Sequence, residues 1–175
     1  MNRIALILLS ALLVSTGLTN APSDDANAKI KVIYIYNFTK YIEWPQNYKE
    51  GHFVISILGN SPGLLSELDN MRNAKKKAGN QDFEFKSISS IDAESKCHIL
   101  FIPSGSDVKI ADITAKLKGK STLIITEKPG SIKQGAMINF IVQDSKQKFE
   151  LNKANAEKYN LKISSALSAL AVSPE

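Results

Sequence analysis

Short apolar runs rich in β-branched residues alternate along this sequence with segments whose apolar residues recur at helical spacing. The runs at 53–58, 98–102 and 122–126 read FVISIL, HILFI and TLIIT, and helical stripes occupy 64–71 and 108–117. Strands that alternate with helices favour a largely parallel sheet with helices on both of its faces. The order of elements therefore predicts an α/β fold.

The later part of the chain departs from this alternation. Residues 83–88 have the pattern of a half-exposed strand, and 137–142 with 148–151 predict a hairpin around residues 144–146. The segment 152–171 has the pattern of a helical tail. We therefore expect a single α/β domain with a mostly parallel mixed sheet, helices on both faces, a C-terminal β-hairpin and a terminal helix.

The segment 29–45 fits two different structures. Ile30, Tyr34 and Phe38 lie at helical spacing, whereas the run 32–36 is rich in β-branched and aromatic residues that suit a strand. Periodicity alone leaves both alternatives open.

The first residues have the parts of a secretory signal. Arg3 provides a positive start, 4–18 form an apolar core, and a polar segment with small residues follows up to Ala28. A membrane-spanning helix needs about 20 apolar residues, so this core is short for a permanent anchor. We expect residues 1–28 to be a cleavable signal peptide and 29–175 to be a domain exported to the periplasm.

Composition argues against a lipoprotein and against a nucleic-acid-binding protein. Cys97 is the only cysteine, so the apolar core has no cysteine near it for lipid attachment, and we expect no direct membrane anchor. The net charge of +5 is mild for 175 residues, and the basic run at 75–77 has no flanking aromatic residues that could stack on bases. We expect no nucleic-acid partner.

A hydrolase-like pattern occurs at 59–63, where the sequence GNSPG matches the G-x-S-x-G of a nucleophile elbow. The residue after the nucleophile must donate its backbone N–H to the oxyanion, and Pro62 has none. The chain also offers few candidate bases, because its only histidines are His52 and His98. We predict no catalytic residues, and we interpret Ser61 and Pro62 as the N-cap and first residue of a helix.

The adjacent pair Cys97 and His98 does not predict a metal site. Neighbouring residues of a strand point to opposite faces of the sheet, so the two side chains cannot easily share one ion. The further ligands that a metal needs are also missing. We expect neither a metal nor another cofactor.

Two loops that follow strands are candidates for a small-ligand pocket. They contribute Asn60 and Ser61 after the first strand, and Ser104 and Ser106 after the run 98–102. The carboxyl ends of parallel strands meet at one edge of a sheet, where ligands of open α/β folds bind. The alternative is that these are ordinary capped loops.

Several segments together resemble one known family, the YfiR-like periplasmic proteins. The match extends from about residue 29 to 171. The similar segments read YNFTKYIEWP at 36–45, CHILFI at 97–102, GAMINF at 135–140, FELN at 149–152 and LKISS at 161–165. Two features depart from the family pattern: Ala136 stands where paired glycines are common, and Cys97 alone cannot form the internal disulfides of several members.

This resemblance implies an α/β fold in which the first segment is helical. It also implies a repressor that restrains an inner-membrane diguanylate cyclase, or another membrane sensor protein, through its periplasmic sensor domain. Such a protein would control cyclic di-GMP and biofilm. An alternative is a periplasmic small-molecule binding module that serves a membrane histidine kinase or a transporter. A second copy of the chain is a further candidate partner.

The C-terminal third offers candidate contact residues for a protein partner. Side chains of a strand alternate between faces, so Glu150 points away from Phe149 and Leu151, and we expect Glu150 to be exposed. Phe140 and Ile163 are the apolar candidates nearby, or else they belong to the core. Trp44 is a weaker candidate for the same surface, because a single tryptophan can equally be a core anchor.

One prediction follows from the single cysteine. No internal crosslink can restrain the unfolded chain, so reductant should not change the stability of the protein. Thermal melts with and without dithiothreitol are expected to overlay. A shift of more than a few degrees would instead indicate a disulfide between two chains.

Overall fold

The computed structural model describes residues 24–92 and 96–174. The expected signal peptide lies mostly outside these residues, and its cleavage after Ala28 stays a prediction. Within the described residues, no helix combines the length and the apolar character needed to cross a membrane.

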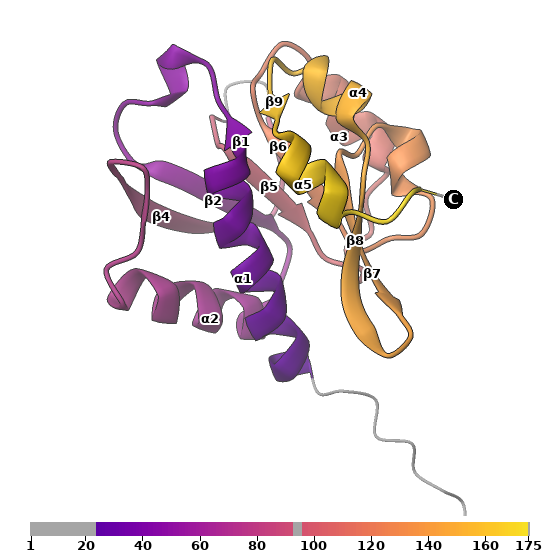
Figure 1. Ribbon diagram of the computed structural model, residues 1–175, viewed down its shortest axis with the longest axis horizontal. Helices are drawn as coiled ribbons and strands as arrows, with labels where there is room; N and C mark the ends of the chain where they lie inside the picture. Colours follow the sequence, from indigo (N-terminus) through magenta and orange to yellow (C-terminus); the bar gives the residue numbers. More distant parts are fainter. Residues whose placement is uncertain (1–23, 93–95, 175) are drawn as a thin grey trace, which may run out of the picture.

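One seven-stranded sheet forms the centre of the fold (Figure 1). Its inner strands run parallel, and the strands at its two edges run antiparallel to their neighbours. This mixed sheet confirms the predicted fold class. In sheet order the strands are β3 (Lys77–Ala78), β4 (Gln81–Ile88), β2 (Phe53–Leu58), β5 (Ile99–Ile102), β6 (Leu123–Thr126), β7 (Ile138–Gln143) and β8 (Lys146–Leu151).

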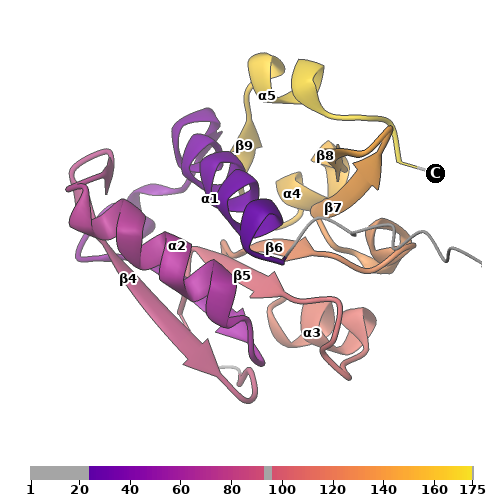
Figure 2. The same cartoon turned by 90° about the horizontal axis from the view of Figure 1, so that it is seen from below.

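Helices lie on both faces of the sheet, as predicted. The helices α1 (Asp24–Tyr41) and α2 (Pro62–Asn73) pack side by side on one face, and α3 (Ile110–Lys116) lies on the other (Figure 2). Short 3-10 turns follow β1 and β6, namely η1 (Gln46–Tyr48) and η2 (Ser131–Gln134). The chain passes from β2 outward to β4 on one side, and from β5 outward to β6 on the other side. The strand order therefore reverses between the neighbours β2 and β5, and ligands of α/β folds bind at such a point.

The first segment is helical, so the structure decides the alternative that the sequence pattern left open. The helix α1 buries Val32, Ile35 and Phe38 against the sheet. Ile30, which lies at helical spacing with Phe38, is 41% exposed. Apolar residues occur on all sides of this helix, so spacing alone could not identify the face that packs.

The C-terminal segment is not one continuous helix, which corrects the predicted helical tail. It contains α4 (Lys153–Glu157), the strand β9 (Lys162–Ile163) and α5 (Ser165–Leu170). The break coincides with a left-handed backbone at Asn160, whose φ is 56°. The strand β9 pairs with β1 (Ile42–Glu43) in a small separate sheet, so pairing with a distant segment interrupts the helix here.

The N-caps of α2 and α4 differ in whether the side chain of the cap residue takes part. Ser61 is at the N-cap of α2, as predicted, but its side chain makes no capping hydrogen bond. At α4, by contrast, the Asn152 side chain accepts a hydrogen bond from the backbone N–H of Asn155 at 2.9 Å. The side chain of Asn155 in turn donates to the Ala136 carbonyl at 2.8 Å. The cap of α4 is therefore tied to the loop before β7.

His98 is a buried structural residue that is held in one tautomer. Its Nδ1 accepts the backbone N–H of Val54 at 3.0 Å, so the proton is on Nε2, which donates to the Tyr48 carbonyl at 2.7 Å. Burial away from water disfavours the charged ring and lowers the pKa of His98 below its ordinary value of 6.5, against the opposing effect of the Tyr48 bond. Protonation of Nδ1 would also break the bond from Val54.

The first prediction from this fold concerns pH. The unfolded chain binds a proton at His98 near its ordinary pKa, whereas the folded chain resists it, so the stabilisation is complete above about pH 6.5 and is lost as pH falls below that value. The melting temperature should therefore fall between about pH 7.5 and about pH 5.5. His98→Asn, which keeps an acceptor near the Nδ1 position, should reduce this fall.

The matched control is His52→Gln, because the His52 side chain is 63% exposed. This variant should retain the pH dependence of the wild type. An equal pH dependence in the wild type and in His98→Asn would show that another group is responsible.

The second prediction compares the two caps. Asn152→Ala removes a capping hydrogen bond and should lower the free energy of unfolding by about 1 kcal/mol. Ser61→Ala should lower it by clearly less, because the Ser61 side chain makes no such bond. Chemical denaturation of the two variants measures both values. A larger loss in Ser61→Ala than in Asn152→Ala would contradict this comparison.

Candidate functional site

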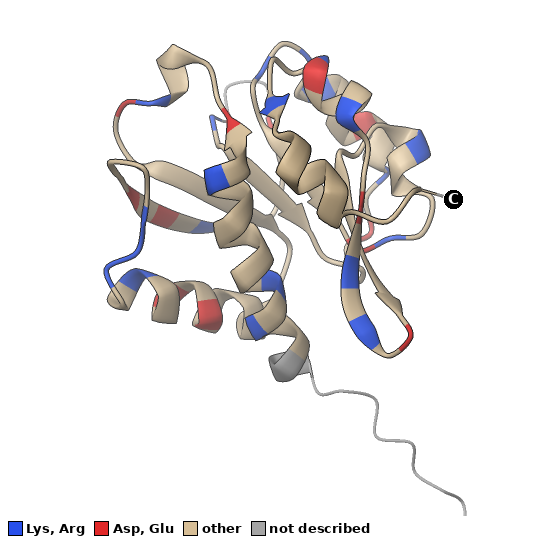
Figure 3. Cartoon of the chain, in the orientation of Figure 1, with Lys and Arg blue, Asp and Glu red and all other residues tan. Residues whose placement is uncertain are grey.

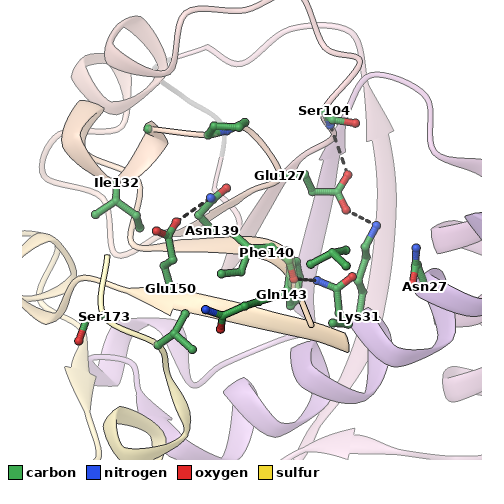
Figure 4. Close-up of a pocket in the computed structure, with 16 residues that line it drawn as sticks. Asn27, Lys31, Ser104, Glu127, Ile132, Asn139, Phe140, Gln143, Glu150 and Ser173 are labelled. Atoms are coloured by element: carbon green, nitrogen blue, oxygen red, sulfur yellow. Dashed lines mark hydrogen bonds and ion pairs between the residues drawn. The ribbon is translucent and has the colours of Figure 1, made fainter. Parts of the chain in front are cut away.

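A cavity of about 570 Å³ lies beside the β7–β8 hairpin, next to the carboxyl edge of the parallel strands. Its walls come from the hairpin, the loop after β6, the turn η2, the first turns of α1 and the C-terminal segment (Figure 4). The cavity therefore combines segments that are far apart in the sequence, including both ends of the described chain.

Three polar side chains form a buried row across three strands, and two of them, Asn139 and Glu150, line this cavity. Thr126 of β6 is opposite Asn139 of β7, and Asn139 is opposite Glu150 of β8. The Thr126 hydroxyl donates to Asn139 Oδ1 at 2.8 Å, and Asn139 Nδ2 donates to Glu150 Oε2 at 2.7 Å (Figure 4 shows the second bond). A buried carboxylate needs such partners, because an unsatisfied one is strongly destabilising.

Glu150 is buried, which corrects the expectation that it is exposed. Its exposed fraction is 8%. The alternation rule was right about direction, since Phe149 packs toward α1 on the opposite face. The rule does not say whether other segments cover that face. Here Ile132 of η2 lines the same cavity as Glu150, and Val172 forms a β-bridge with Glu150.

Phe140 belongs to the core and also lines the cavity. Its exposed fraction is 4%, which favours the core alternative for this residue. The ring packs against α1, with its centroid 6.0 Å from that of Tyr34 and 6.1 Å from that of Phe38. Phe140 therefore connects the wall of the cavity with the packing of the first helix.

An ion pair forms a further part of the cavity wall. Lys31 of α1 pairs with Glu127 after β6, and the backbone N–H of Ser104 donates to Glu127 Oε2 at 3.3 Å (Figure 4). Both charged side chains are mostly buried, with exposed fractions of 17% and 14%. This pair fixes the start of α1 to the carboxyl edge of the sheet.

Trp44 and Ile163 lie in a different place from Phe140 and Glu150. They line a second cavity of about 610 Å³, formed by the β1–β9 sheet and the turn after β3. Both are core side chains, with exposed fractions of 5% for Trp44 and 7% for Ile163, which favours the core alternative for both residues. The structure thus divides the four predicted contact residues between two cavities.

Three of the four predicted ligand-pocket residues do come together. Asn60, Ser61 and Ser104 line a third cavity, of about 350 Å³, where the loops after β2 and β5 meet. Ser106 is not among its lining residues, and its hydroxyl donates to the Leu58 carbonyl at 2.7 Å. The Lys31–Glu127 pair and Ser104 border both this cavity and the first one.

Sequence reasoning missed the partners of Glu150 and the ion pair. Asn139 interrupts the apolar run of β7, and Thr126 ends that of β6. A polar residue inside an otherwise apolar strand is a usable signal, because such side chains are seldom buried without a partner. Nothing in the sequence joins Lys31 to Glu127, since only the tertiary fold brings them together.

The histidine and cysteine side chains, which are common in catalysis and metal binding, lie elsewhere than in these three cavities. Neither His52 nor His98 lines any of them. Within the described residues, no group of three His, Cys, Asp or Glu side chains could hold a metal ion. Cys97 is buried, and desolvation raises the pKa of its thiol, which keeps this sulfur protonated and unreactive.

Comparison with solved structures supports the fold. A conserved domain protein from Vibrio cholerae O1 biovar El Tor str. N16961 superimposes with a TM-score of 0.54 at 13% sequence identity. The match covers 85% of this chain and 60% of that structure, so the present chain spans only part of its length. At this low identity the likeness concerns the fold alone.

Comparison with curated proteins gave no significant match. A family model described as YfiR/HmsC-like, in contrast, matches residues 28–172, which is most of the sequence. This match confirms the resemblance seen in the five sequence segments. The chain therefore belongs to the YfiR/HmsC-like family, a family of periplasmic regulators of diguanylate cyclase systems that are not themselves catalytic.

Proposed function

We propose that this protein binds the periplasmic sensor domain of an inner-membrane diguanylate cyclase and restrains it. Restraint of the cyclase lowers cyclic di-GMP and therefore biofilm formation. Family membership supports a role in diguanylate cyclase systems. The observation that supports particular contact residues is the cavity beside the β7–β8 hairpin, which has the buried Glu150 carboxylate at its base.

The rim of this cavity carries an exposed apolar residue that a protein partner could cover. Val142 is 58% exposed and lines the cavity next to Gln143, which is also exposed. Phe140 supplies a buried aromatic wall behind them. An exposed apolar rim around a buried polar group suits a partner that inserts one side chain and buries the rim around it.

We assign the main contact to this cavity rather than to the one at Trp44 and Ile163. The Trp44 ring packs edge-on against Phe53 at 5.0 Å, and Ile163 is paired with Ile42 in the small sheet. Substitutions of Trp44 or Ile163 would mainly disturb the core. These two residues are therefore poorer candidates for a contact surface that must form and separate.

A second candidate function is the binding of a small molecule, with a membrane histidine kinase or a transporter as the protein served. The volume of about 570 Å³ is the observation that favours it, because it is within the range of sites for drug-sized ligands. Native mass spectrometry of the protein purified from the periplasm would distinguish the candidates. A retained small molecule that Glu150→Gln removes would favour the binding module.

The prediction for the proposed function uses the rim residue Val142. Val142→Asp places a charge on an exposed apolar contact, so it should abolish repression while stability changes by less than about 0.5 kcal/mol. Glu150→Gln should also weaken repression, because it removes the charge but keeps an acceptor for Asn139. The measurement is cyclic di-GMP in a deletion strain that carries each variant, together with co-purification of the cyclase.

A matched control is Ile33→Asp, because Ile33 is an apolar residue of similar exposure, 53%, that does not line the cavity. This variant should repress like the wild type. Full repression by both Val142→Asp and Glu150→Gln would place the contact elsewhere. Loss of repression in Ile33→Asp alone would place it on α1. Glu150→Lys is unsuitable here, since it would bury an ammonium group against the Asn139 amide.

A further inference from the structure

Basic side chains gather where α2 ends and in the turn that follows it. Arg72, Lys75, Lys76 and Lys77 are all exposed, and Figure 3 shows this turn in blue at the β3 end of the sheet. Lys40, in the last turn of α1, is exposed as well. These five residues are called the basic cluster below. The proposed function uses none of them.

The ring of Tyr36 holds two ammonium groups of the basic cluster close together. The Nζ atom of Lys40 lies 4.2 Å from the centroid of this ring, and the Nζ atom of Lys76 lies 5.7 Å from it. The two nitrogens therefore lie within about 10 Å of each other, which is close to the screening length in about 0.1 M salt. Like charges at this separation repel each other, and the face of a tyrosine ring offsets only part of the repulsion.

Carboxylates neutralise only the margin of the basic cluster. Arg72 pairs with Asp69 at 2.7 Å, and Lys77 pairs with Asp82 at 3.0 Å. The other three basic side chains of the cluster form no ion pair with a carboxylate within the residues that the structure describes. The centre of the cluster therefore carries a positive charge that an anion from outside the chain can neutralise.

Lys75 occupies a backbone position that glycine usually occupies. Its φ is 55°, in the left-handed region, where an L side chain is strained. The N–H of Lys75 donates to the Arg72 carbonyl at 2.8 Å, and the N–H of Lys76 donates to the Met71 carbonyl at 3.4 Å, as in helices that end with one left-handed residue. The helix dipole favours a cation near this end, but Arg72 already supplies one in the last turn. Local structure thus gives little reason for a lysine at this position.

We propose that the basic cluster binds the phosphate groups of anionic phospholipids at a membrane surface. Lysine is a common ligand of phosphate, and groups of several Lys and Arg side chains are typical of proteins that contact anionic lipids. A soluble phosphate compound is usually held in a concave site, but neither Lys75 nor Lys76 lines any of the three cavities. An exposed group of cations suits a broad surface with many phosphates better.

Membrane contact through the basic cluster leaves the Glu150 cavity accessible. The cluster is at the β3 end of the sheet, and the β7–β8 hairpin is at the other end. A protein that rests on a membrane by its β3 end can therefore still contact another protein beside the hairpin. The inference does not depend on the proposed function, because it requires only an anionic bilayer.

Sedimentation with lipid vesicles tests the proposal. The protein purified from the periplasm is mixed with vesicles of phosphatidylcholine that either contain or lack phosphatidylglycerol. The wild type is expected to sediment only with the anionic vesicles and to dissociate as the salt concentration rises. The double variant Lys40→Glu with Lys76→Glu should bind more weakly by on the order of tenfold or more, because one lysine at an anionic surface contributes about fivefold.

The matched control is Lys118→Glu with Lys133→Glu, which changes the net charge equally at two exposed lysines outside the basic cluster. It should bind the anionic vesicles like the wild type. Equal weakening in the two double variants would show attraction by net charge alone and would overturn the proposal. A wild type that does not bind the anionic vesicles, or that binds both kinds of vesicle equally, would also overturn it.

Lys75→Gly separates vesicle binding from folding. Glycine suits the left-handed backbone, so this variant should keep or raise the melting temperature while it weakens vesicle binding about fivefold. Unchanged binding would contradict the role assigned to Lys75. Circular dichroism verifies that each of the charge-reversal variants is folded.

Calorimetric titration with inorganic phosphate distinguishes a lipid headgroup from a soluble phosphate compound. No saturable binding of inorganic phosphate is expected in the absence of vesicles. Saturable binding that Lys40→Glu with Lys76→Glu removes would assign the basic cluster to a soluble ligand, and the proposal of a membrane contact would then be wrong.

Discussion

The packing of the Phe38 ring of α1 connects the first helix of this protein with its last hairpin, and the arrangement of the site depends on it. Phe38 is fully buried, with its ring centroid 5.2 Å from that of Phe149 and 6.1 Å from that of Phe140. Side chains of a strand alternate between faces, so turning these phenylalanines toward α1 turns Asn139 and Glu150 to the opposite face. A slip of one residue in β7 or β8 would exchange the two sets.

The polar row is possible because each of its members has a partner in the same register. Asn139 is the middle member, and its amide accepts from Thr126 and donates to Glu150. Replacing such a row with apolar side chains is often neutral or stabilising, whereas removing one member leaves a buried polar group unsatisfied. A contribution to stability therefore explains the polar row poorly. A role in selecting what binds in the cavity explains it better.

The sequence predicted most of the fold because short strands and helical stripes leave local signals. The run 53–58 coincides with β2, and the hairpin at Asp144 and Ser145 turns through two left-handed residues, as a two-residue hairpin loop requires. Covering of a face by distant segments leaves no local signal. For this reason the direction of Glu150 was predictable and its burial was not. The division of Trp44 and Glu150 between separate cavities could not be predicted either, since it depends on where the small β1–β9 sheet packs.

The two edges of the central sheet differ in how the rest of the chain covers them. At the β8 end, the Tyr34 hydroxyl donates to the Gln147 carbonyl at 3.3 Å and Val172 bridges to Glu150, so other parts of the same chain cover that edge. At the β4 end, opposite charges and a half-buried aromatic ring border an open edge. Four strands lie between β4 and β8, and substitutions at sites that share no partners act nearly independently. A change at the β4 edge should therefore leave the polar row and the cavity unaltered.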